Sequence, residues 1–305
     1  MCTSVALHLD KFYFGRNLDL EYDFGDGVVF MPRSYPLRLR EGRTVARHFA
    51  VFGMGIIKDG FPLFAEGGNE AGVCIAGLNF RGNAHYTNFK VEGRLNLAPF
   101  ELIPYLLSTC PTAKDAKEQF LKINLVDVPF DDSIQNTHLH FHLADKESAY
   151  ALEFTKDGAF AYDDAYGTLT NNPPFPFHDH NAKMYMHLST AQPKTEGLFT
   201  GGVGAIGLPG DYSSPSRFIK AAWLVKMQDG CTELSYHDLF STLNAVAPPR
   251  RAVITEDNRE HFTRYTCCID TEDLIYYCKR YSSADTQKVK IKRELFDTDR
   301  VVLLN

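Results

Sequence analysis

The sequence lacks any apolar run that approaches the roughly 18 residues a membrane-spanning helix needs. It also lacks a basic run, and its net charge is −6, which argues against nucleic acid or an anionic membrane as the main partner. The opening residues, Met1-Cys2-Thr3-Ser4, show neither the basic nor the apolar region of a signal peptide. We therefore expect a cytoplasmic protein that neither spans a membrane nor binds nucleic acid.

The seven cysteines include no Cys-x-x-Cys pair, which excludes a zinc ribbon and a thioredoxin-like motif. In a reducing cytosol most of these thiols should behave as small buried apolar groups. The chain has 305 residues, 44% of them apolar, which is enough to bury a large core. No repeat, low-complexity tract or linker divides it, so we expect one domain over residues 1–305.

Alternating and aromatic-rich runs predict strands in the first quarter, the middle and the tail of the chain, with helices between them. Their order, strands then helices then strands, with antiparallel hairpins throughout, favours sheets sandwiched between helices over a doubly wound parallel sheet. The predicted strands are 5–9, 12–16, 62–66, 72–78, 137–143, 149–155, 159–163, 264–269 and 274–281. The predicted helices are 98–108, 112–123, 214–226, which Ser214 should cap ahead of Pro215, and 236–246, which Ser235 should cap.

Cys2 stands apart from the other cysteines because of its position. Removal of Met1, which aminopeptidases carry out when the next residue is small, would leave a thiol and an α-amine on one residue. An α-amine has a pKa of about 7.7–8.0, so at neutral pH part of it is unprotonated and can accept the thiol proton. Such a residue can be nucleophile and base at once. The alternative is that Cys2 is simply the second residue of a buried strand.

The first predicted hairpin brings two charged residues towards Cys2. If it turns on a two-residue loop at 10–11, Cys2 faces Asp19 and Val5 faces Arg16. A carboxylate beside the α-amine would hold the amine in place, and the nearby guanidinium would favour the thiolate. The alternative for Arg16 and Asp19 is an ordinary surface ion pair.

Five ordered blocks resemble the choloylglycine hydrolase family, whose members are bile salt hydrolases and penicillin V acylases. Together they span residues 1 to about 220, and five blocks in the family's order are a stronger signal than any one alone. The blocks are Met1-Cys2-Thr3, Tyr13-Phe14-Gly15-Arg16-Asn17-Leu18-Asp19, Ala76-Gly77-Leu78-Asn79-Phe80, Leu169-Thr170-Asn171-Asn172-Pro173, and Gly207-Leu208-Pro209-Gly210-Asp211 with Ser213-Ser214-Pro215-Ser216-Arg217-Phe218.

This resemblance implies an α+β fold, the four-layer αββα sandwich of N-terminal-nucleophile hydrolases, with two antiparallel sheets between helix layers. It implies that Cys2 is the nucleophile and its amine the base, that Arg16 supports the thiolate and that Asp19 binds the amine. It implies no metal and no organic cofactor. The family is typically a homotetramer held by a projecting segment, and residues 191–201 look short for that role.

Three further residues match the family's blocks. By resemblance, Asn79 and Asn171 help to line an oxyanion hole. Without the resemblance, each asparagine is interpreted as a turn or strand-end residue whose side chain forms hydrogen bonds with the nearby backbone. Arg217 falls in the first turn of a predicted helix, where a cation opposes the helix dipole, so we expect a partner elsewhere. By resemblance Arg217 braces the site; the alternative is a solvated charge.

The function implied is an amidase that releases glycine or taurine from a conjugated bile acid. Asn79 favours this branch, because the penicillin V acylase branch tends to carry an aromatic residue there. Penicillin V acylase, and a non-catalytic steroid-binding member of the same fold, remain the alternatives. A steroid needs a wide apolar cleft beside Cys2. Candidates for its lining are Phe61, Phe64, Phe80, Phe100 and Phe130, although each alone reads more naturally as core.

Two other patterns point to different chemistry. Residues 202–207 match the dinucleotide pattern Gly-x-Gly-x-x-Gly, but Leu-Pro-Gly follows instead of a helix, so we do not expect nucleotide binding. His138, His140 and His142 alternate along a predicted strand and share one face, as zinc ligands could. No carboxylate or cysteine obviously completes a zinc site, so we interpret these histidines as part of a partly buried strand face.

Overall fold

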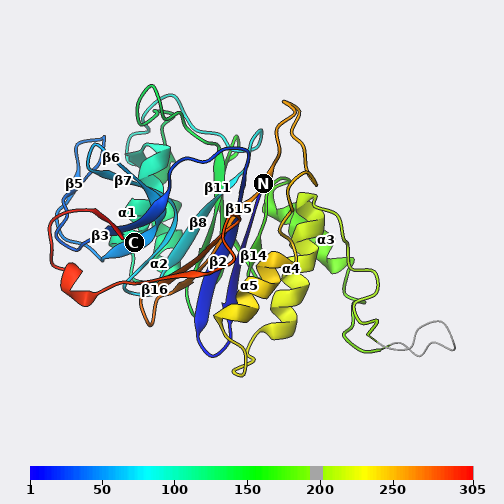
Figure 1. Cartoon of the computed structure of the whole chain (residues 1–305). Helices are drawn as coiled ribbons and strands as arrows, with labels where there is room; N and C mark the ends of the chain where they lie inside the picture. The colour runs from blue at the N-terminus through cyan, green and yellow to red at the C-terminus, as the bar shows by residue number, and fades with distance from the viewer. Residues whose placement is uncertain (193–201, 305) are drawn as a thin grey trace.

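The computed structural model describes residues 1–192 and 202–304, and two large sheets lie face to face between layers of helices (Figure 1). Both sheets are antiparallel throughout. The first consists, in spatial order, of β14 (Thr168–Leu169), β1 (Cys2–His8), β2 (Phe12–Leu20), β15 (Phe262–Asp270), β16 (Ile275–Arg280) and β17 (Gln287–Lys290). The second consists of β13 (Gly158–Asp163), β12 (Ala149–Thr155), β11 (Leu139–Ala144), β8 (Cys74–Asn79), β7 (Phe61–Asn69), β6 (Val51–Lys58), β3 (Gly27–Met31) and β18 (Val302–Leu304).

Helices cover the outer face of each sheet. The eight-stranded sheet packs against α1 (Leu102–Thr109) and α2 (Ala113–Phe120), and the six-stranded sheet against α4 (Ser214–Gln228) and α5 (Tyr236–Asn244). Helix α3 (Phe175–Lys183) packs on α4. The four-layer αββα sandwich expected from the resemblance is therefore confirmed. Smaller elements are β4 (Leu37–Arg38), β5 (Thr44–Val45), β9 (Leu95–Leu97), β10 (Ile123–Leu125) and the 3₁₀ turns Pro99–Glu101 and Arg293–Leu295.

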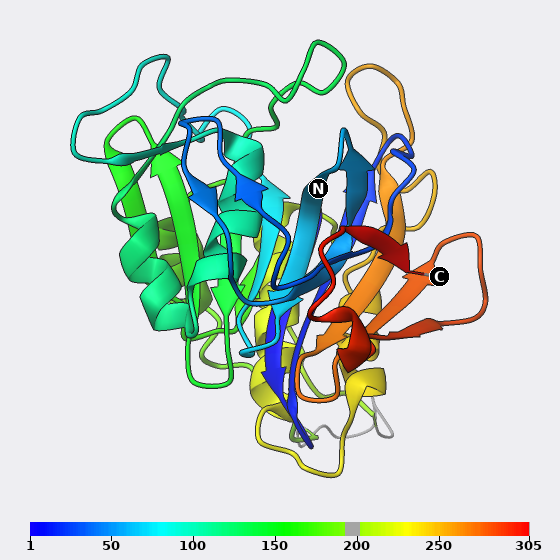
Figure 2. The same cartoon turned by 90° about the vertical axis from the view of Figure 1, so that its left-hand side faces the viewer.

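The C-terminal segment connects the two sheets. Strand β17 is the last strand of the six-stranded sheet, while β18 pairs with β3 at the edge of the eight-stranded sheet. Figure 2 shows this segment in red, running from one sheet to the other. No helix of the described residues combines the length and the apolar character that crossing a membrane requires.

Helix starts follow local side-chain chemistry. Thr112 caps α2 by accepting a hydrogen bond from the Asp115 amide, and Ser235 forms a capping box at α5. The predicted cap of α4 was wrong by one residue, because Ser213, not Ser214, accepts from the Ser216 amide. Pro215 is therefore one residue further inside the first turn than expected, where its missing N–H is still unneeded. Helix α3, with a proline in its first turn and no strong apolar periodicity, was not predicted.

The predicted register of the first hairpin was also wrong by one residue. Cys2 lies opposite Leu18, and Ser4 lies opposite Arg16, because the strands are joined by the three residues 9–11 and not by two. Asp19 instead pairs with Met1, whose carbonyl accepts the Asp19 amide at 3.1 Å. A one-residue shift moves side chains to the opposite face. The observed register therefore puts Arg16 on the same face as Cys2.

Candidate active site

Cys2 is the first residue of β1, and its side chain lies at a cavity of about 640 Å³ between the sheets and the loops beyond them. The residue is only 3% exposed, so the cavity is its route to solvent. Arg16, Asp19 and Asn79 also line this cavity. Residues of three strands, β1, β2 and β8, therefore meet at the cavity that holds the Cys2 thiol.

Arg16 binds the thiol directly. Its Nη2 donates to Cys2 Sγ at 2.7 Å, while Nη1 donates to the Gly77 carbonyl at 2.9 Å and to Glu66 Oε2 at 3.2 Å. Arg16 is fully buried. Burial alone would lower its pKa, but the adjacent Cys2 and Glu66 raise it above its ordinary value, so the guanidinium stays charged. A fixed cation at this distance favours the thiolate.

Arg217 and Asn171 fix the backbone of Cys2. The Cys2 amide donates to Asn171 Oδ1 at 2.7 Å, and continuation of the β1–β14 register explains why these residues meet. Arg217 donates to the Cys2 carbonyl at 2.5 Å, to Thr3 Oγ1 at 2.6 Å and to Asn171 Oδ1 at 2.8 Å. The expected partner for this cation exists, and it is the nucleophile strand. Burial lowers the pKa of Arg217, against the opposing effect of Asp19.

Asp19 lies beside the start of the chain with one oxygen unused. Its Oδ1 accepts from Thr263 Oγ1 at 2.6 Å, whereas Oδ2 is buried and has no hydrogen-bond partner among the described residues. The Met1 amine donates to the Asp19 carbonyl at 3.1 Å and contacts His261 Nε2. Burial lowers the pKa of this amine, although the Asp19 charge opposes the shift. A buried carboxylate oxygen without a partner, such as Asp19 Oδ2, lowers stability unless a hydrogen-bond donor binds it.

The two asparagines differ in how their amides are used. Asn79 ends β8, and its Oδ1 accepts the Arg81 amide at 3.0 Å, which leaves Nδ2 without a hydrogen-bond partner among the described residues. Asn171 Nδ2 donates to the Asn79 carbonyl at 2.8 Å, so one of its two amide hydrogens is already bound. His178 and Ser214 hold the Asn171 backbone carbonyl and amide. Both side chains therefore have fixed orientations next to Cys2.

The cavity is largely apolar away from Cys2. Of the five phenylalanines considered for a cleft, Phe64, Phe100 and Phe130 line it. Phe61 is not in the lining but packs edge-on against Phe100, with ring centroids 5.5 Å apart. Phe80 is buried core and stacks on His140 at 4.2 Å, so its placement in the cleft was wrong. Other apolar lining residues are Leu18, Leu20, Phe24, Ile56, Leu63, Pro99, Ile103, Ile134, Leu139 and Phe141.

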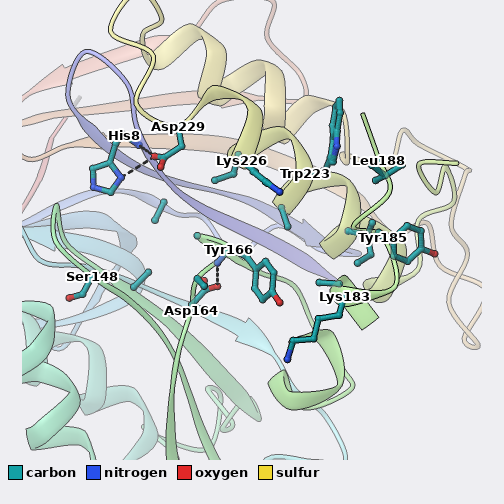
Figure 3. Close-up of a pocket in the computed structure, with 18 of the residues that line it drawn as sticks. His8, Ser148, Asp164, Tyr166, Lys183, Tyr185, Leu188, Trp223, Lys226 and Asp229 are labelled. Carbon is teal, nitrogen blue, oxygen red and sulfur yellow. Dashed lines mark hydrogen bonds and ion pairs between the residues drawn. The ribbon is translucent and has the colours of Figure 1, made fainter. Parts of the chain in front are cut away.

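A second cavity of similar size, about 650 Å³, lies beside α4 (Figure 3). Lys226 and Trp223 of α4 and Tyr166 contribute to it, and a His8–Asp229 pair lies at one end. None of the described residues that line it is a cysteine, and its histidine is bound to Asp229 and to the Lys146 carbonyl. The cavity at Cys2 is therefore the candidate for covalent chemistry.

The patterns that suggested other chemistry have structural explanations. His140 and His142 are fully buried: His140 contacts the Thr170 carbonyl and Glu153, and His142 contacts Ser4 and Asp164. The three imidazoles do not form a metal site, since no group of three possible ligands occurs among the described residues. No helix directly follows the described glycine-rich residues 202–207, as a dinucleotide site would require.

Several residues around the site were not predicted from the sequence. Glu66, Tyr265 and Tyr276 meet behind Arg16, and His178 supports Asn171. A single glutamate within the apolar strand 61–69 is the one local signal that could have drawn attention to Glu66. The tyrosines and His178 carry no such signal, because strands and helices commonly contain them.

Comparison with known proteins identifies relatives along the whole chain. A family model described as linear amide C–N hydrolases, choloylglycine hydrolase family, matches residues 2–303. The chain is 33% identical over 313 residues to a bile salt hydrolase/transferase of Lactiplantibacillus plantarum, covering 99% of this chain and 96% of that protein. It is 33% identical over 318 residues to a conjugated bile acid hydrolase of Lactobacillus gasseri, covering 99% of both.

Solved structures of other proteins support the same family. A crystal structure of a mutant conjugated bile acid hydrolase from Clostridium perfringens has a TM-score of 0.93 at 31% identity, covering 99% of this chain and 96% of that one. The penicillin V acylase from Agrobacterium tumefaciens shares the fold, with a TM-score of 0.78 at 17% identity and coverage of 98% and 90%. The αββα fold around a buried Cys2 thiol thus belongs to a hydrolase of linear amide bonds, and the chain is a member of the choloylglycine hydrolase family.

Proposed function

We propose that this protein hydrolyses the amide bond of glycine- or taurine-conjugated bile acids, with Cys2 as the nucleophile. The observation that carries the proposal is the Cys2 thiol, bound by Arg16 at 2.7 Å, at one end of a largely apolar cavity of about 640 Å³. Such a cavity suits a rigid apolar steroid body with one polar amide tail. The relatives whose names specify bile salts or conjugated bile acids support the same substrate class.

The mechanism begins with removal of Met1, which frees the α-amine of Cys2. That nitrogen already donates to Asn171 Oδ1, and the unpartnered Asp19 Oδ2 is available as a second acceptor beside the chain start. The amine takes the thiol proton as sulfur attacks the amide carbonyl, forming the C–S bond. The carbonyl electron pair moves to oxygen, where Asn79 Nδ2 and the free amide hydrogen of Asn171 donate to it.

Collapse of this intermediate breaks the C–N bond. The proton held by the α-amine moves to the leaving nitrogen, which departs as glycine or taurine, and the bile acyl group remains on sulfur as a thioester. A water molecule then attacks the thioester with the amine again as base. The C–S bond then breaks, the amine returns its proton to sulfur and so restores the Cys2 thiol, and the bile acid leaves and loses its carboxyl proton to solvent.

The test measures release of glycine and taurine from glycocholate and taurocholate, with the intact mass of the same sample showing whether Met1 has been removed. Cys2→Ala should abolish release without unfolding the protein. Cys231→Ala is the matched control, because Cys231 does not line the cavity. Turnover by Cys2→Ala would mean that another residue attacks. Better turnover of penicillin V than of either bile salt would assign this chain to the acylase branch, and binding of bile salts without turnover would indicate a steroid-binding protein.

Two predictions from the sequence remain predictions. The cytoplasmic location follows only from the absence of a signal peptide pattern. The homotetramer depends on a segment, residues 191–201, most of which lies outside the described residues. Size-exclusion chromatography with light scattering measures the assembly directly.

A further inference from the structure

Glu66 is a carboxylate buried between the two sheets on the far side of Arg16 from Cys2. It belongs to β7 of the eight-stranded sheet and is 0% exposed. Its partners are on the other sheet: Arg16 donates to Oε2 at 3.2 Å, Tyr265 to Oε2 at 2.8 Å and Tyr276 to Oε1 at 2.6 Å. Glu66 does not line the cavity. Arg16, which contacts both Glu66 and Cys2, is therefore the link between this carboxylate and the cavity.

The backbone next to Glu66 is shaped to aim it inward. Ala65 forms a β-bulge, since Phe64 pairs with Gly55 and Glu66 pairs with Met54. Bulges re-aim the neighbouring side chain and carbonyl, and Arg16 Nη1 also donates to the Ala65 carbonyl at 3.4 Å. Gly53 permits this local path, because a Cβ there would lie 2.1 Å from the Glu66 carbonyl oxygen.

The surroundings of Glu66 match its ionised form. Burial raises the pKa of Glu66, while Arg16 and the two tyrosine hydroxyls lower it. Glu66 accepts hydrogen bonds from Arg16, Tyr265 and Tyr276, and the guanidinium, which carries a charge and cannot accept, favours the carboxylate. The titratable or charged groups that face Glu66 from the elements packed around it are Arg16 on β2, Tyr265 and Cys267 on β15, Tyr276 and Cys278 on β16, and Asp26 before β3.

One guanidinium thus binds both a carboxylate and the Cys2 sulfur. Arg16 Nη1 binds Glu66 and Nη2 binds Cys2. A carboxylate beside Arg16 both fixes the guanidinium and cancels part of the field that would stabilise a thiolate. A thiolate that is held too strongly is less nucleophilic, because nucleophilicity falls as the thiol becomes more acidic.

We propose that Glu66 is a positioning residue that fixes Arg16 and limits how strongly Arg16 stabilises the Cys2 thiolate. The Cys2 proton moves to the α-amine during attack. This inference rests on the proposed function, because it takes Cys2 as the nucleophile. Tyr265 and Tyr276 have the opposite effect to Glu66, since their hydroxyls stabilise the carboxylate and weaken its field at Arg16.

The test is the pH profile of Cys2 alkylation by iodoacetamide, followed by peptide mass, on chains that begin at Cys2. Glu66→Gln removes the charge with little change of shape, so the midpoint should move to lower pH by about one unit. The value of kcat for glycocholate should fall about threefold or more, with KM unchanged. Tyr276→Phe removes a donor and keeps the charge, so its midpoint should move to higher pH.

Two controls separate this role from loss of stability. Tyr277→Phe alters the next residue of β16, which stacks on Tyr236, and should leave the midpoint unchanged. Glu70→Gln breaks another glutamate–arginine pair, with Arg33, away from the cavity, and should also leave it unchanged. A Glu66→Gln midpoint that stays in place or rises, or a Tyr276→Phe midpoint that moves down, overturns the proposal. Alkylation needs no bile salt, so failure to hydrolyse glycocholate would refute the proposed function and leave this test intact.

Discussion

Replacing Arg217 by lysine tests whether the several N–H donors of the guanidinium, and not only its charge, position Cys2. The Arg217 guanidinium donates to four acceptors: the Tyr212 carbonyl at 3.0 Å, the Cys2 carbonyl, Thr3 Oγ1 and Asn171 Oδ1. A lysine ammonium keeps the charge but is a single point that cannot reach all four. Each hydrogen bond from a charged donor contributes about 1.5–3 kcal/mol, so the loss of two should lower the free energy of unfolding by about 3 kcal/mol.

The larger effect should be on catalysis. Asn171 and the Cys2 backbone would lose their shared anchor, and a displacement of about 1 Å at the nucleophile can cost about 100-fold in rate. We therefore expect kcat for glycocholate to fall about 100-fold while KM changes little, because Arg217 does not line the cavity. Arg33→Lys, which weakens the Glu70 pair away from the site, should lower stability without this loss of kcat. Arg217→Lys with kcat within about twofold of the parent would refute the positioning role.

Four further outcomes follow from the same geometry. Chains that retain Met1 should be inactive because the amine is an amide; full turnover by a sample whose mass shows Met1 on every chain would contradict this. Asp19→Asn should lower kcat by orders of magnitude, since a neutral amide holds the ammonium poorly; single-turnover kinetics measure it. Burial lowers the pKa of His178 from 6.5 to about 4, so the unfolded chain binds more protons between these values. The free energy of unfolding should therefore fall as pH drops from 6.5 to 4, by up to about 1.4 kcal/mol per unit, and His178→Gln should flatten this slope in denaturant titrations. Finally, kcat/KM for glycocholate should exceed that for penicillin V at least about tenfold, or 1.4 kcal/mol, and Asn79→Tyr should erode the preference.

Elements with strong local signals could be predicted from the sequence. The strand predicted at 149–155 has those bounds in the structure, and the caps of α2 and α5 follow from Thr112 and Ser235. Alternation and capping depend on neighbours within a few residues, so the sequence contains them directly. Helix α3 has neither signal and was missed for that reason.

The register in which strands pair was harder to predict from the sequence. Asp10-Lys11 suggested a two-residue loop, yet the loop takes in residue 9 as well, and this single residue decides which side chains share a face with Cys2. In the predicted register Arg16 would have pointed away from the thiol that it binds. The resemblance named Arg16 and Asp19, which both line the cavity at Cys2, but only the fold explains how they reach opposite sides of β2.

Contacts between elements far apart in the sequence were beyond local reasoning altogether, and they determine the charge balance of the site. Arg16 and Arg217 are buried cations, and Glu66 and Asp19 are buried carboxylates, from positions spread over 200 residues of sequence. With Cys2 as a thiol and its amine neutral, the two cations and two anions cancel. Moving the proton from sulfur to the amine of the same residue leaves this total unchanged, so the nucleophile can form in a water-poor site without adding net buried charge. A separate base farther away would instead create two isolated charges. With Cys2 as the nucleophile that we propose, this balance of two cations and two carboxylates is the physical reason that one N-terminal residue can supply both nucleophile and base.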